Sequence, residues 1–151
     1  MIKSLYIVSK SGLPLFYFDE QNTNSTQFEN DATLFSGVLS AIQSFLSEIK
    51  VGSVKNFMTE TYEIIISPRN NIICAVIIDR ESRIAVKEVE ELIKTIFKSM
   101  DNKFKDYEIF DKSIPELEYK QLYDIVITAY NNWIKQAKKS KADKTMKESF
   151  W

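Results

Sequence analysis

The sequence predicts an α+β domain, built like a sandwich, in which a five-stranded antiparallel sheet is flanked by helices. Three observations predict it. Five short runs are rich in Ile, Val, Leu, Tyr and Phe and are bounded by turn residues. Three longer segments repeat their apolar residues with the 3.6-residue period of a helix. Their order along the chain is β-β-α-β-β-β-α-α, which favours a small open sheet covered by helices.

The composition fits one globular domain that lacks the common groups of enzyme sites. The chain has 151 residues, of which 44% are hydrophobic and 27% charged, as in an ordinary folded domain. It contains no histidine, which removes the usual general base and the commonest metal ligand. Neither GxxxxGK(S/T) nor GxGxxG occurs. For these reasons we expect a non-enzymatic protein with no catalytic residue, cofactor or metal. We also expect it to be cytoplasmic, because the sequence shows neither an apolar leader nor a run of eighteen apolar residues.

The first two strand-like runs, residues 2–8 and 13–19, are joined by a Ser-Lys-Ser-Gly turn and form a predicted hairpin. Gly12 would supply the positive φ of a tight turn. Pro14 would start a strand at a sheet edge, where it has no ladder hydrogen bond to lose. The turn has too few glycines and donors for a ligand loop, so we expect it to be structural.

A first helix is predicted from Asn30 or Asp31, either of which can cap it, to about Lys50, with Gly52 as the C-cap just beyond. Apolar residues fill an arc of about 160° around this helix, which is wide enough to lie on the sheet with part of it to spare. The opposite side is small or neutral in place of the Glu and Lys that usually face water. The apolar arc consists of Ala41, Leu34, Phe45, Val38, Ile49, Ile42, Phe35, Leu46 and Leu39.

Three more strands are predicted at residues 53–60, 61–66 and 72–79. The first of them would be an edge strand, which needs protection or a mate. Residues 72–78 are apolar at every position, so this strand should be covered on both faces near the centre of the sheet. Cys74 lies within it and is expected to be a small buried side chain.

The small face of the first helix is a predicted partner-binding surface, because small side chains let a second helix approach closely. Two structural explanations compete with this one. Serine can simply be tolerated on an exposed face, or the third helix or the C-terminal tail can cover it. The residues of the predicted surface on this helix are Ser36, Gly37, Ser40, Gln43, Ser44 and Ser47.

Two further helices complete the predicted domain, residues 1–138. One begins at Val86 and has a charged outer face, and the other follows Pro115 and runs over about residues 116–138. Residues 139–151 are a predicted lysine-rich tail, either a solvated terminus or a weak contact for a partner or an anionic membrane. The net charge of −1 argues against nucleic-acid binding.

The element order resembles that of a longin domain, of the kind found in archaeal relatives of trafficking proteins. The hairpin precedes the first helix, with KSGLPLFYF at its turn and DATLFSGVLSAIQSFLSEI after it, and the resemblance covers about residues 1–135. Roadblock domains are similar but place a helix before the first strand. The resemblance implies pairing through the first helix and the edge strand, which adds Val54 and Phe57 to the predicted surface. The implied partner is the chain itself, another longin or roadblock domain, or a small GTPase. It also implies a role in small-GTPase regulation or membrane trafficking.

A second functional class also fits the predicted architecture. Profilin-like and PAS-like sensory domains have a sheet flanked by helices and enclose a small molecule between the two. This alternative predicts a cavity of several hundred Å³ lined by Tyr and Phe.

Overall fold

The computed structural model describes residues 2–19, 26–50, 52, 55–69, 72–82, 84–104 and 116–149. Its elements follow the predicted order and confirm the predicted fold class. They are β1 (Ser4–Ser9), β2 (Pro14–Asp19), α1 (Thr26–Glu48), β3 (Asn56–Met58), β4 (Tyr62–Arg69), β5 (Ile72–Asp79), α2 (Val86–Lys103) and α3 (Glu116–Ser149).

The five strands form one sheet in the order β2-β1-β5-β4-β3, with every neighbouring pair antiparallel. The uniformly apolar strand β5 is the middle one, as its sequence predicts, and it is buried along nearly its whole length. β2 and β3 are the two edges, which agrees with the predicted roles of Pro14 and of the strand after the first helix.

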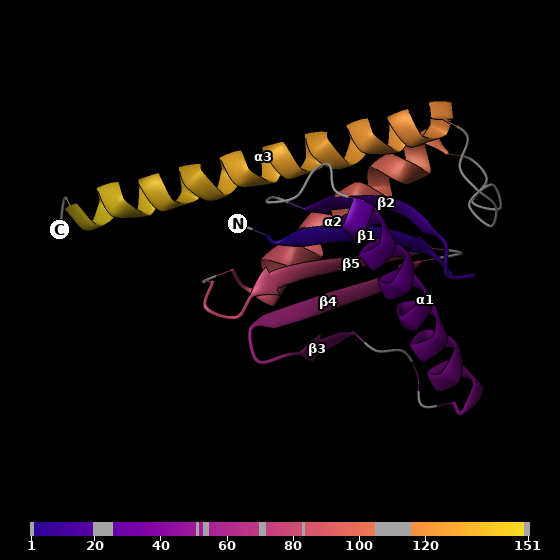
Figure 1. The fold of residues 1–151 in the computed structure, drawn as a ribbon. Helices are drawn as coiled ribbons and strands as arrows, with labels where there is room; N and C mark the ends of the chain where they lie inside the picture. Colours follow the sequence, from indigo (N-terminus) through magenta and orange to yellow (C-terminus); the bar gives the residue numbers. More distant parts are fainter. Residues whose placement is uncertain are drawn as a thin grey trace.

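The sheet has helices on both faces (Figure 1). α2 covers one face and α3 runs along the β2 edge on that side, whereas α1 crosses the other face alone. Because side chains alternate along a strand, β5 contributes Cys74 and Val76 to the larger core under α2 and α3, and Ile73 and Ala75 to the smaller core under α1. Burial raises the pKa of the Cys74 thiol to about 12, because desolvation disfavours the thiolate. The prediction that Cys74 is a buried side chain is confirmed.

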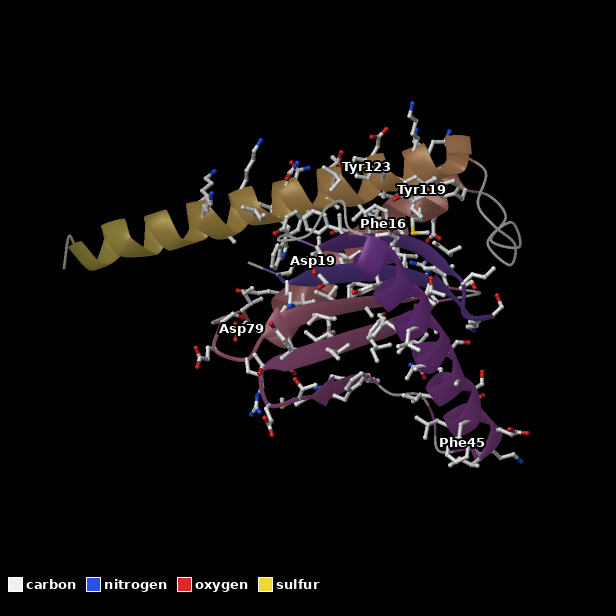
Figure 2. All side chains as sticks on the ribbon, in the orientation of Figure 1. Phe16, Asp19, Phe45, Asp79, Tyr119 and Tyr123 are labelled. Atoms are coloured by element: carbon white, nitrogen blue, oxygen red, sulfur yellow. The ribbon has the colours of Figure 1, made fainter. Side chains whose placement is uncertain are left out.

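α3 is fixed to the body by aromatic side chains of its N-terminal part. Tyr119 and Tyr123 lie near Phe16 of β2, with ring centroids 6.2 and 6.0 Å from it (Figure 2). The Trp133 indole donates a hydrogen bond to the Glu88 carbonyl oxygen of α2, at 3.1 Å. Beyond this point α3 continues past the sheet (Figure 1).

Three predicted boundaries are wrong. α1 begins at Thr26, before the predicted Asn30 or Asp31. Its end at Glu48 is close to the predicted one, and both Lys50, with φ 61°, and Gly52, with φ 107°, have positive φ there. β3 has only three residues. α3 continues to Ser149, well past the predicted end near residue 138, so residues 139–149 are helical.

Candidate functional site: the first helix and its pocket

The hairpin turn between β1 and β2 positions α1 on the sheet. Gly12 adopts φ +96°, the left-handed conformation that its place in the turn predicts. A Cβ added at Gly12 would lie 3.6 Å from both the Gly37 Cα and the Ser40 Cβ, which is ordinary contact distance. The Ser40 hydroxyl donates a hydrogen bond to the Lys10 carbonyl oxygen in the same turn. The small residues of α1 therefore allow the turn, and not a second helix, to approach closely.

The orientation of α1 differs from the expected one. Ser36 is fully buried and Ser40 is 9% exposed, and both point into the fold beside Leu39. The helix is rotated so that only Leu39, Phe35 and Leu46 from the apolar arc are buried or half-buried. The apolar arc is expected to cover the sheet with part of it to spare, but six of its nine residues are exposed, which is far more than that expectation allows. The physical reason is the Gly12 turn, which needs small residues and a hydroxyl donor beneath it.

The rotation leaves five large apolar side chains of α1 exposed on one face, here called the α1 apolar surface. Their spacing of four, four, three and four residues places them on one side of the helix. Phe45 lies near the C-terminal end of α1, far from the aromatic contacts of α3 (Figure 2). The exposed fractions are 70% for Leu34, 51% for Val38, 36% for Ile42, 60% for Phe45 and 50% for Ile49.

The other residues of the predicted surface are distributed over three places. Gly37 is exposed beside the hairpin turn. Gln43, Ser44 and Ser47 line a pocket. Phe57 of β3 is half-buried against the core under α1, and Val54 lies outside the described residues.

The edge strand β3 is the second exposed feature on this side of the molecule. It pairs with β4 on one side only, and in the described part of the chain no strand covers its outer side. Met58 of β3 is a further exposed large apolar side chain. An uncovered strand edge and an exposed apolar helix face are each typical of a surface that binds another protein chain.

The pocket has a volume of about 560 Å³ and lies between the C-terminal half of α1 and the sheet. One wall is the serine-rich side of α1, and Lys10 of the hairpin turn stands at the rim. Pro68 of β4 and Ile73 of β5 supply the apolar part. Its size matches the cavity expected of a sensory domain, but its described lining contains neither Tyr nor Phe. The lining residues are Lys10, Ser40, Gln43, Ser44, Ser47, Glu48, Pro68 and Ile73.

The described residues offer neither a metal-binding cluster nor a membrane-spanning helix. Within them, no group of three His, Cys, Asp or Glu side chains is arranged to hold a metal ion. No helix in the described ranges combines the length and the apolar character needed to cross a membrane.

The fold and surface define an α+β domain with one thinly covered sheet face, and known structures share its architecture. A chain in a homology model of the full-length AP-3 complex is 15% identical and has a TM-score of 0.53. The match covers 95% of this chain and 99% of that chain. At that identity the likeness shows the fold alone.

Two further solved structures are similar to parts of the chain. The Roadblock/LC7 domain from Streptomyces avermitilis is 17% identical with a TM-score of 0.44, over 62% of this chain and 87% of that domain. Myxococcus xanthus MglB is 19% identical with a TM-score of 0.45, over 65% of this chain and 85% of that protein. No family model matches the chain, and no curated protein matches its sequence.

Proposed function

We propose that the chain is a non-catalytic interaction module of the longin type that pairs with a second copy of itself through the α1 apolar surface and the β3 edge. The α1 apolar surface is the observation that carries the proposal. Each large apolar side chain gains about 1.5–3 kcal/mol when it moves from water into a full apolar contact. Five of them on one helix face therefore favour association strongly.

A two-fold symmetric pair uses both exposed features at once. In such a pair the same surface of each copy contacts its equivalent in the partner. Two α1 helices then pack antiparallel, with Ala41 and Ile42 near the symmetry axis, because these residues lie midway between Val38 and Phe45. A related longin or roadblock domain with a matching surface would satisfy the same contacts.

The link to small-GTPase regulation or membrane trafficking rests on the resemblance of the sequence to longin domains. The shared architecture with a chain of the AP-3 complex supports the fold on which that link depends. In this proposal the paired domains present their remaining surface to a small GTPase or a trafficking complex.

Cysteine cross-linking tests the pairing surface. In an antiparallel pair, Ala41→Cys lies opposite itself, and Val38→Cys lies opposite Phe45→Cys, so mild oxidation should link Ala41→Cys to itself and the other two variants to each other. The native Cys74 should not compete, because it is buried and its pKa is raised. Lys94→Cys, on the exposed face of α2, is the matched control and should remain monomeric on a non-reducing gel.

If Ala41→Cys does not cross-link, or if Lys94→Cys cross-links as well as Ala41→Cys does, the contact lies elsewhere. The GTPase part has its own test. Purified small GTPases of the source organism, loaded with a fluorescent nucleotide, should release it faster or bind the protein measurably. If neither effect occurs across the whole set, that part of the proposal fails and the pairing part stands.

A further inference from the structure

The pocket beside α1 has a chemistry that pairing does not use. The α1 apolar surface points away from the sheet, whereas the pocket lies on the sheet side of the same helix. Ser40, Gln43, Ser44 and Ser47 follow one another at three- or four-residue spacing, so they form a continuous polar wall along about two turns. The chemistry of this wall suits a ligand that exchanges hydrogen bonds with it.

Two opposite charges stand at the two ends of that wall. The backbone of Lys10 lies at the Ser40 end, because its carbonyl oxygen accepts the hydrogen bond from the Ser40 hydroxyl. Glu48 lies eight residues farther along α1, which corresponds to about 12 Å of helix rise. The pocket lining therefore includes a basic residue near one end of the polar wall and an acidic residue near the other.

The side of the pocket opposite the polar wall is apolar. Ile73 of β5 is buried beneath it and Pro68 of β4 stands beside it. A ligand that fits both sides has hydrogen-bonding groups along one edge and small apolar groups along the other. An extended peptide has this character, because its backbone amides and its side chains point in different directions.

We propose that this pocket binds a short peptide with free termini, with the peptide carboxylate at Lys10 and its ammonium group at Glu48. Three extended residues span about 10 Å, close to the rise of α1 from Ser40 to Glu48, and the pocket of about 560 Å³ has room for them. A single amino acid is shorter than this stretch of helix.

This inference does not rest on pairing, and the two are separable by experiment. The probe is trialanine, whose binding is measured by titration calorimetry and by NMR shifts of the backbone amides of residues 40–48. A ligand of this size is expected to bind with a Kd on the order of several hundred micromolar. N-acetyl-trialanine, trialanine amide, free alanine and inorganic phosphate are the counter-probes, and each should bind more weakly than trialanine.

The variants test the two charges and the cavity itself. Lys10→Met and Glu48→Gln should each weaken trialanine binding by up to about fivefold, because each removes one partly solvated ion pair. Lys10→Met should abolish the preference for a free carboxylate, and Glu48→Gln the preference for a free amino group. Ser44→Phe should block binding by filling the pocket. Lys94→Met, on α2, is the control and should bind like the wild type.

Three results would overturn the inference: no saturable binding of trialanine, equal binding of the blocked peptides, or binding that Ser44→Phe leaves unchanged. Thermal unfolding shows whether each variant is folded, so loss of binding in a folded variant is interpretable. Tighter binding of phosphate than of trialanine would show that the pocket is an anion site.

Discussion

The Lys3 ammonium group donates a hydrogen bond to the Tyr62 hydroxyl at 3.0 Å and lies 4.5 Å from the centre of the same ring. The hydrogen bond to Tyr62, with the nearby charges of Asp19 and Asp79, raises the pKa of Lys3 above its usual 10.5, against a smaller effect of burial. The contact joins the residue before β1 to the first residue of β4, across β5.

Because the folded protein binds this proton more tightly than the unfolded chain, the contact contributes stability that is fully present below pH 10.5. The contribution is lost as the pH rises through the higher pKa of the folded state. Lys3→Met should therefore lower the free energy of unfolding near neutral pH by less than about 1 kcal/mol, since the group is partly solvated.

The measurement is urea unfolding of the wild type and Lys3→Met at several pH values. The difference in the free energy of unfolding between the two proteins should become smaller above pH 10.5. Lys94→Met, on a solvated helix face, should show no such trend. If the difference in the free energy of unfolding grew with pH, the charged Lys3–Tyr62 contact would not be its cause.

Some single-residue features could be predicted from the sequence, and others could not. The positive φ of Gly12 and the burial of Cys74 follow from the few residues around each of them. The Lys3–Tyr62 contact joins residues 59 positions apart, and no local pattern encodes such a pair.

The rotation of α1 has a direct consequence for substitutions on its serine side. Ser40 is 9% exposed and its hydroxyl bonds the hairpin turn, whereas Ser44, one turn later, is exposed at the pocket. Ser40→Arg should destabilise the protein by about 2–3 kcal/mol, because it overpacks the contact with the turn and removes a hydrogen bond. Ser44→Arg should change stability by less than about 0.5 kcal/mol.

Chemical denaturation of the two variants measures this difference. If the serine side of α1 faced water along its whole length, the two substitutions would have the same small effect. Equal stability of Ser40→Arg and Ser44→Arg would therefore contradict the observed orientation.

The sequence identified α1 as an amphipathic helix, but its rotation could not be predicted. An apolar arc of about 160° is wider than one helix needs to cover a sheet, so the pattern does not say which part of the arc is buried. The start of α1 had a usable signal, since Thr26-Gln27-Phe28-Glu29 has the capping-box spacing. The long α3 has one too, because neither Gly nor Pro occurs after Pro115. The lysines near its end favour a tail by composition alone, but lysine is also a good helix former.

The whole molecule has two unequal faces. The face under α2 and α3 holds the larger core, and the face under α1 holds a smaller one. The order of the elements, the central strand and both edge strands could be predicted, because each depends on a period or a turn signal within one segment. The exposed surface of α1 could not, because it depends on how α1 meets a turn that lies far away in the sequence.

The solution mass of the wild type and of Phe45→Glu, measured by sedimentation equilibrium at micromolar concentration, tests the pairing of two copies most directly. The wild type should have twice the chain mass of 17.6 kDa. Phe45→Glu should return a single chain mass, because it buries an unpaired carboxylate in each half of the interface and weakens pairing by about a hundredfold or more. Leu13→Glu, which replaces an exposed leucine outside the α1 apolar surface, should leave the double mass unchanged. A wild-type solution mass of 17.6 kDa, or a Phe45→Glu variant that is still a dimer, would contradict pairing through the α1 apolar surface.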